Sequence, residues 1–248
     1  MGFSLRTIDP QSKFSSQITM QAIEKVIPQA TVEAVLTEQQ AWHERERKLS
    51  MPAVVLALIM MSLYRHLAIG HVIKKMAQGL RFLWPDPTYP VPGASAFSYR
   101  RYQLGVGTME ALFKQVSRPI ATRETPGAFL FGRRLMALDG TTVRVPDTAS
   151  NEAFFGRHKS GRGRTAFPNL QCVFLAEAGT HAVVDAGFWP SRESERTGGF
   201  RLLRSVEAGM LLMWDRGFHS YDMFEAVISG SNAQPHGAQP HGAQPHGA

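Results

Sequence analysis

The sequence is poor in cysteine and contains no long apolar segment, and each absence excludes a class of protein. Cys172 is the sole cysteine, so no intramolecular disulfide can form, which fits a reducing cytoplasm. The longest apolar-rich run covers residues 53–63, whereas a membrane-spanning helix needs about 20 residues. Residues 1–10 lack the apolar stretch of a secretory signal. We therefore expect a cytoplasmic protein that does not enter a membrane.

Acidic residues are also in deficit. The chain has 27 Lys and Arg against 20 Asp and Glu, which gives a formal net charge of +7 and a pI near 9.9. An excess of positive charge favours an anionic partner, and nucleic acid is the commonest of these.

Residues 1–130 have mainly helical patterns. The stretch 94–116 contains two short helical patterns on either side of Gly105-Val106-Gly107, which resembles a helix-turn-helix. Arg100 and Arg101 fall on its first helix and are candidates for DNA contact. Two packed helices joined by glycines would give the same pattern, so plain packing remains the alternative.

The pattern changes in residues 131–230. Residues 135–145 and 166–190 have the alternation of strands, the second range as a hairpin, and 194–207 and 220–229 have helical periodicity. The apolar run 209–215 predicts a fully buried strand of a parallel sheet. This order indicates an α/β domain. Residues 231–248 contain three tandem AQPHG repeats, and we expect this tail to be disordered.

One carboxylate ends each of two apolar-rich stretches. Asp139 ends LMALD, and Asp215 ends MLLMWD. Sites in α/β sheets form where strands end, so neighbouring strands would direct both carboxylates into one crevice. Such a pair suits Mg²⁺ or Mn²⁺. The alternative is two unrelated turn aspartates, and Asp147 and Asp185 are further candidate ligands.

Basic residues lie close to both carboxylates in the sequence. Arg216 directly follows Asp215, where it could orient that carboxylate, touch phosphate or form a salt bridge. The loop RHKSGRGR (157–164) can neutralise phosphates without reading bases, although a solvated loop would look the same. Its candidate DNA-binding residues are Arg157, Lys159, Arg162 and Arg164.

Two sequence blocks carry a resemblance to a known family. The stretches ALDGTTVRVPDTASNEAFFG (137–156) and LLMWDRGFHSYDMFEAV (211–227) resemble signature blocks of insertion-sequence transposases of the Asp-Asp-Glu superfamily, insertion-sequence-four type. ITMQAIEKVI (18–27) with RKLSMPAVVLALIMMSLYR (47–65) resembles the helical N-terminal domain of that group. The resemblance spans roughly residues 10–230.

The resemblance implies an RNase H-like catalytic core after a mainly helical N-terminal domain. Asp139 and Asp215 would be catalytic and would be the first and second ligands of Mg²⁺ or Mn²⁺. The implied reaction is metal-dependent phosphodiester cleavage and strand transfer in DNA-mediated transposition. The implied partners are insertion-sequence ends, target DNA, and a homo-oligomer or full-length transposase, in a nucleoid-associated location in the bacterial cytoplasm.

The sequence also departs from the family. The family's third carboxylate is a glutamate on a later helix, in a block rich in Tyr, Arg and Trp, and no such block follows Ser229. We therefore expect an incomplete core in a C-terminally truncated transposase that is inactive alone. The alternatives are a catalytically dead fragment that binds DNA or inhibits a transposase, and a pseudogene product with exposed apolar surface on its last helix.

Overall fold

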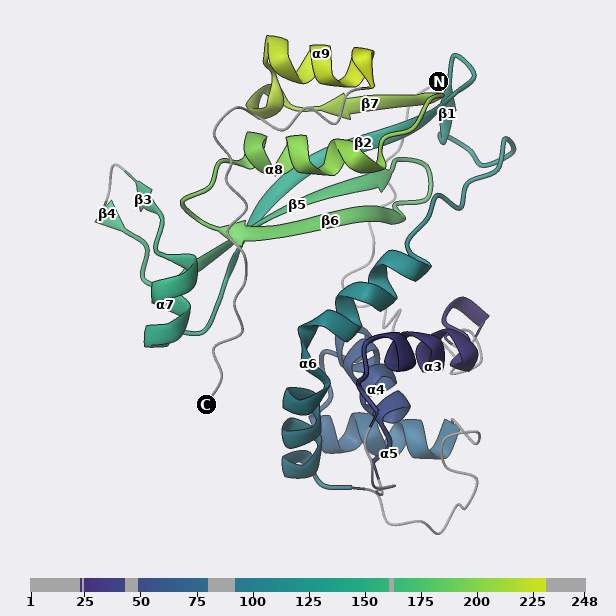
Figure 1. The fold of residues 1–248 in the computed structure, drawn as a ribbon, viewed down its shortest axis with the longest axis vertical. Helices are drawn as coiled ribbons and strands as arrows, with labels where there is room; N and C mark the ends of the chain where they lie inside the picture. The colour runs from purple at the N-terminus through teal and green to yellow at the C-terminus, as the bar shows by residue number, and fades with distance from the viewer. Residues whose placement is uncertain (1–22, 24, 43–48, 80–91, 161–162, 231–248) are drawn as a thin grey trace. The chain divides into compact units, whose positions relative to one another are not determined.

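The computed structural model describes residues 23, 25–42, 49–79, 92–160 and 163–230 (Figure 1). The chain divides into two compact units, residues 1–116 and 117–248. The sequence predicts the boundary between the two domains near residue 130. Residues 117–130 join the second unit because the backbone N–H groups of Ile120 and Ala121 donate to the carboxylate of Glu177, at 3.2 and 2.8 Å.

Some predictions fall outside the described residues. They concern the AQPHG tail, most of the helix that TMQAIEKVI (19–27) predicts, and most of the loop that the prolines of 84–93 predict. In the described part of the chain, no helix is both long enough and apolar enough to cross a membrane.

The described part of the first unit is helical. The apolar run 53–63 forms a helix at the centre of its core, in which Val54, Val55 and Met60 are completely buried. Pro52 stands in the first turn of that helix, where its missing N–H has no intrahelical partner to lose. The helices are α3 (Gln29–Glu38), α4 (Met51–Leu63), α5 (Ile69–Gly79) and α6 (Ala94–Val116).

Helix α6 consists of two helical stretches joined by a kink, as the glycine pattern predicted. The kink lies at Gly105, whose φ of 71° falls in the left-handed region that glycine tolerates best. Arg100 is only 4% exposed and hydrogen-bonds to Gln103, whereas Arg101 is exposed. The structure therefore separates the two arginines, and only Arg101 lies on the surface.

The second unit is built around a mixed sheet with helices, so its fold is mixed α/β (Figure 1). Strand β2 is central: it pairs antiparallel with β1 and β5 and parallel with β7, and β5 pairs antiparallel with β6. The strands are β1 (Phe129–Leu130), β2 (Arg133–Arg144), β5 (Asn169–Glu177), β6 (Val183–Pro190) and β7 (Met210–Trp214), with β3 (Lys159–Ser160) and β4 (Gly163–Arg164) forming a separate small hairpin. The helical segments are α7 (Ala149–Phe155), α8 (Glu195–Leu202), η1 (Leu203–Ser205), η2 (Arg216–Phe218) and α9 (Tyr221–Ser229).

Helix α8 packs closely because Gly198 faces the sheet and Gly199 faces the 3₁₀ turn η2. A Cβ added at Gly198 would lie 2.8 Å from Val173, and one at Gly199 would lie 2.7 Å from the Phe218 ring. The Ser194 side chain caps the helix by accepting the N–H of Thr197 at 3.1 Å. The regular helix ends at Leu202, earlier than the predicted 207, and continues as the 3₁₀ turn η1.

Strand β7 corrects one prediction. The sequence predicted a fully buried strand in a parallel sheet, and β7 does pair parallel with β2. It is not fully buried, however, because within the described residues it pairs with β2 alone and Met213 is 43% exposed. An unbroken apolar run was the wrong signal here, since the run belongs to an outer strand.

Candidate functional site

The parallel pairing of β2 and β7 brings the two predicted carboxylates together. Leu138 pairs with Trp214, so Asp139 and Asp215 are the next residues along two adjacent strands. Neighbouring strands lie about 4.8 Å apart, which places the two backbones side by side at this level. Strand β7 ends at Trp214, and the chain turns into η2 directly after Asp215. Asp215 therefore stands at the end of β7, as predicted. Asp139 instead lies inside β2, which continues to Arg144, so the expectation of a strand end is wrong for Asp139.

Backbone N–H groups hold both aspartates in place. Asp139 accepts the N–H of Gly140 at 2.8 Å, and Asp215 accepts the N–H of Gly217 at 2.7 Å. Both residues are exposed, and neither forms an ion pair within the described residues. One oxygen of each carboxylate is thus held by a backbone N–H group, and both side chains are open to solvent.

A third carboxylate, which the sequence analysis did not select, lies against this pair. Glu195, in the first turn of α8, has its Oε1 only 1.8 Å from where a Cβ of Gly140 would be, and its Oε2 3.6 Å from that of Gly217. Burial, followed by the negative charges of Asp215 and Asp139, raises the pKa of Glu195. Gly140 therefore leaves the space that the Glu195 carboxylate occupies, whereas a side chain at Gly217 would be in ordinary contact with it.

The donor set fits a hard divalent cation at the aspartate pair. Carboxylate oxygens on adjacent strands, without cationic partners, are the ligands that Mg²⁺ and Mn²⁺ prefer, with water and phosphate oxygens completing the shell. Among the residues that the structure describes, no three His, Cys, Asp or Glu side chains are grouped to hold a metal ion. Asp139 and Asp215 are thus the candidate ligands, and Glu195 stands beside them.

The candidate DNA-binding residues differ in whether an acidic side chain already pairs with them. Arg157 donates to Asp147 at 2.5 Å and forms an ion pair with Glu152 at 3.1 Å, so its charge is largely neutralised. Its hydrogen bond to Glu152, opposed in part by burial and aided by the charge of Asp147, raises the pKa of Arg157. Arg164 is exposed and only 3.4 Å from Glu152, and Arg216 is exposed beside Asp215. Arg162 and the side chain of Lys159 lie outside the described residues.

The two alternative ligands have other partners. Asp147 binds Arg157, as above, and Asp185 on β6 accepts hydrogen bonds from Arg204 at 2.9 Å and Ser205 at 2.7 Å. Strand β6 is separated from β2 by β5. The structure therefore assigns both carboxylates to ion pairs away from the Asp139–Asp215 pair.

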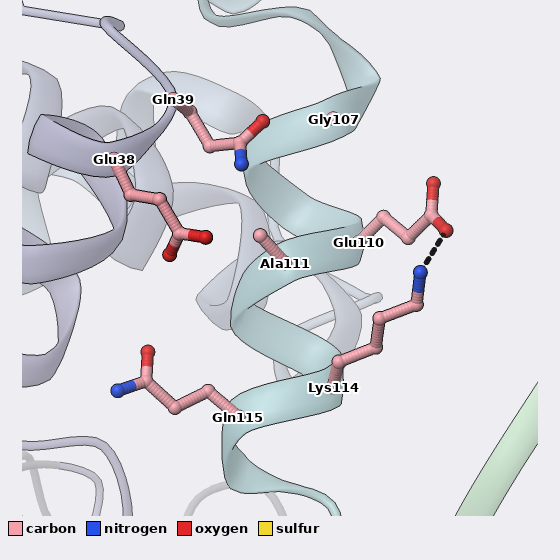
Figure 2. A pocket seen from close by; sticks show the side chains of 7 residues that line it. All are labelled: Glu38, Gln39, Gly107, Glu110, Ala111, Lys114 and Gln115. Carbon is pink, nitrogen blue, oxygen red and sulfur yellow. Dashed lines mark hydrogen bonds and ion pairs between the residues drawn. The ribbon is translucent and has the colours of Figure 1, made fainter.

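A polar hollow in the first unit is a separate feature (Figure 2). Two carboxylates face it, and Lys114 pairs with one of them, Glu110, at 2.6 Å. This balance of charge does not favour phosphate, so we assign the hollow no role in binding DNA. Its lining residues come from the end of α3 and the second half of α6: Glu38, Gln39, Gly107, Glu110, Ala111, Lys114 and Gln115.

Comparison with known proteins finds matches to insertion-sequence transposases. Residues 17–114 match the family model "Insertion element 4 transposase N-terminal". The chain is 25% identical over 182 residues to the transposase InsG for insertion sequence element IS4 of Escherichia coli K12, which covers 73% of this chain and 40% of InsG. It is 26% identical over 130 residues to the putative transposase InsZ of the same strain, which covers 52% of this chain and 44% of InsZ. No solved structure matches.

These matches support an insertion-sequence transposase of the IS4 type, as the family resemblance indicated. The aligned part is about two fifths of the length of the curated relatives. What the intact relatives do therefore enters below as a proposal.

Proposed function

We propose that this chain acts on DNA as an insertion-sequence transposase and that Asp139 and Asp215 form its site for phosphodiester cleavage and strand transfer. The observation that carries the proposal is the β2–β7 register, which makes the two aspartates neighbours on adjacent strands. The strand order, with two antiparallel strands on one side of β2 and a parallel strand on the other, supports an RNase H-like core.

The chain's own residues have distinct tasks in this proposal. Asp139 and Asp215 would hold Mg²⁺ or Mn²⁺, and such an ion, when bound, activates water and stabilises charge on the reacting phosphate. Gly140 and Gly217 donate N–H groups that orient the two carboxylates. Arg216 and Arg164, both exposed, would hold the phosphate backbone of insertion-sequence ends or target DNA. An association with the nucleoid follows from this action on DNA.

The alternative function is a DNA-binding fragment without cleavage activity that competes with an intact transposase. The observation that favours it is the absence, in the described residues, of a third carboxylate grouped with the pair as a metal ligand. In this case the basic residues would still bind DNA, and Asp139 would be dispensable for that binding.

A cleavage assay separates the two functions. The chain is incubated with labelled DNA carrying the ends of its insertion element, with Mg²⁺ or with a chelator. Nicking that needs both Mg²⁺ and Asp139 supports the transposase, and salt-sensitive binding without nicking supports the competing fragment. Failure to bind DNA even at low salt would reject both.

The adjacent arginines of α6 provide a prediction with a built-in control. Arg101→Ala is expected to weaken DNA binding about threefold to tenfold, as for loss of one phosphate contact, and to leave the melting temperature unchanged. Arg100→Ala removes a buried side chain and is expected to lower the melting temperature instead. Electrophoretic mobility shift assays and thermal melts of both variants test this. Equal effects of the two substitutions on DNA binding, with equal melting temperatures, would contradict it.

Gly140→Ala is expected to weaken metal binding severalfold with little loss of stability. The new methyl group would occupy the position of the Glu195 carboxylate, and that flexible side chain can swing away from the aspartate pair. Glu195→Gln should weaken Mn²⁺ binding similarly. The double variant should add little further, because each change removes the negative charge of Glu195 from the neighbourhood of the aspartate pair. Gly70→Ala, at a position with open space, is the control. Additive effects in a calorimetric double-mutant cycle would show that Gly140 and Glu195 act separately.

A further inference from the structure

Two exposed arginines of the second unit are held by backbone carbonyls and not by carboxylates. Arg192 donates to the carbonyl oxygen of Phe154 at 3.0 Å, and Arg196 donates to that of Gly217 at 3.4 Å. Neither arginine forms an ion pair with any residue that the structure describes. The sequence analysis selected neither of them as a candidate for DNA contact.

A carbonyl bond fixes an arginine side chain and leaves its positive charge uncompensated, since a carbonyl has no net charge. Arg201, also in α8, shows the opposite case, because Glu193 pairs with it at 2.6 Å. Each carbonyl bond of Arg192 and Arg196 uses only one of the N–H donors of the guanidinium, so the others remain for a ligand. These two side chains are therefore suited to binding an anion.

Arg196 lies beside the aspartate pair. Gly217, whose carbonyl accepts from Arg196, donates its own N–H to Asp215 at 2.7 Å. The residue before Arg196 in the first turn of α8 is Glu195, whose carboxylate occupies the space that Gly140 leaves. An anionic group brought to the aspartate pair would therefore lie close to the Arg196 guanidinium.

Arg192 extends the cationic surface from the start of α8 toward α7. Its partner Phe154 belongs to α7, and the neighbouring Ser191 donates to the carbonyl oxygen of Phe155 at 3.0 Å. These contacts join α7 to the end of β6, and Figure 1 shows α7 at the end of the sheet toward which β6 runs. The two arginines thus lie along one path from the aspartate pair to α7.

We propose that Arg196 binds the DNA phosphate that is cut at the aspartate pair and that Arg192 binds a phosphate further along the same DNA, toward α7. This inference rests on the proposed function, because it takes DNA as the ligand of the pair. Arginine suits the task, since its planar guanidinium can donate two parallel hydrogen bonds to phosphate oxygens. The carbonyl bonds already restrict both side chains, so less conformational entropy is lost when phosphate binds.

Binding of labelled duplex DNA that carries the element ends, measured in a chelator, tests both contacts without cleavage. Arg196→Ala and Arg192→Ala are each expected to weaken binding about threefold to tenfold and to reduce the slope of log affinity against log salt by about 0.9, as for one lost phosphate contact. The control is Arg123→Ala, an exposed arginine that also donates to a carbonyl, that of Gly132 at 2.9 Å, but lies beside the turn before β2. An unchanged slope in either variant, or an equal decrease in the control, would overturn the proposal.

A single neutral group in the DNA tests the position of Arg196. The probe is the same duplex with a methylphosphonate in place of the phosphate at the junction of element and flanking DNA, which removes one charge there. Arg196→Ala is expected to bind this probe as tightly as the wild type does, because the contact is already lost, whereas Arg192→Ala should still bind it more weakly. If Arg196→Ala loses as much affinity for the modified DNA as for the unmodified DNA, Arg196 does not contact that phosphate.

Failure of this inference can be told apart from failure of the proposed function. If nicking depends on Mg²⁺ and Asp139 but the arginine variants bind DNA as the wild type does, only the inference is wrong. If the arginine effects are found without nicking, the phosphate contacts stand and the cleavage activity is rejected. Thermal melts of the three alanine variants are expected to match the wild type, since each variant removes an exposed side chain.

Discussion

Asp139→Asn is expected to weaken Mn²⁺ binding at least about a hundredfold, because it removes one of the two charged ligands of the proposed site. Loss of residues that merely support a metal ligand already costs 10- to 100-fold, so loss of a ligand should cost at least as much. Asparagine keeps an oxygen that can accept the N–H of Gly140, so the local backbone should be retained. Isothermal titration of each variant with Mn²⁺ gives the affinity.

The same substitution has a second signature. Without metal, Asp139→Asn should be as stable as the wild type or slightly more stable, since it relieves the repulsion that Asp139 and Asp215 exert on Glu195. With saturating Mn²⁺ the wild type should melt at a higher temperature, and the variant should show no such increase. The matched control is Asp222→Asn, an exposed carboxylate on α9. An unchanged Mn²⁺ affinity in Asp139→Asn would exclude that carboxylate as a ligand.

Glu177→Gln is expected to lower the stability of the second unit by about 2–4 kcal/mol at pH 7, as for a broken buried ion pair that keeps part of its hydrogen bonding. Glu177 is completely buried and accepts hydrogen bonds from Ile120, Ala121 and Thr180 and from the guanidinium of Arg134. In the variant, an amide NH₂ group would take the place of one carboxylate oxygen of Glu177. It would then face N–H and O–H donors with no acceptor for them. Urea unfolding at pH 7 measures the loss, with the exposed Glu225→Gln as a control expected to change stability by less than about 0.5 kcal/mol.

The effect of Glu177 should depend on pH in a defined direction. Burial, the largest influence, raises the pKa of Glu177, but the hydrogen bonds from Thr180, Ala121, Arg134 and Ile120 outweigh it, so the pKa lies below the ordinary 4.5. The stabilisation from the charged form is therefore present above the unfolded-state pKa and is lost as the pH falls through the lower folded-state pKa. The stability gap between wild type and variant should narrow below pH 4. A gap that stays constant from pH 7 to pH 3 would contradict this.

The carboxylate pair could be predicted from the sequence, because apolar runs are local features, although only Asp215 stands at a strand end. Asp139 and Asp215 each follow an apolar run, and the two blocks around them resemble one family. The structure adds the register that makes them neighbours, which no local pattern contains. Glu195 was missed for the same reason: its place beside the pair depends on the close packing of α8, which Gly198 and Gly199 allow. A glutamate in the first turn of a glycine-containing helix was the available signal.

The basic residues show the limit of composition as a guide. Arg157 looked like a phosphate-binding residue of a flexible loop, but its partners Asp147 and Glu152 lie on the preceding turn and helix. Arg100 and Arg101 are adjacent in sequence, yet helical geometry buries one and exposes the other. Charged side chains can be counted from a sequence, whereas tertiary contacts decide which of them are free to bind phosphate.

The account depends most on Asp139 and Asp215 sharing a divalent ion, and iron-directed cleavage tests this directly. With added hydrogen peroxide and ascorbate, Fe²⁺ bound in place of Mg²⁺ reduces the peroxide to hydroxyl radicals that cut the backbone close to the ion, and ascorbate regenerates Fe²⁺. We expect cuts near residues 139–141 and near 215–217, suppressed together by excess Mg²⁺ and lost together in either Asp139→Asn or Asp215→Asn. Cuts at only one of the two segments, or cuts at both that persist when either aspartate is replaced, would contradict a shared ion.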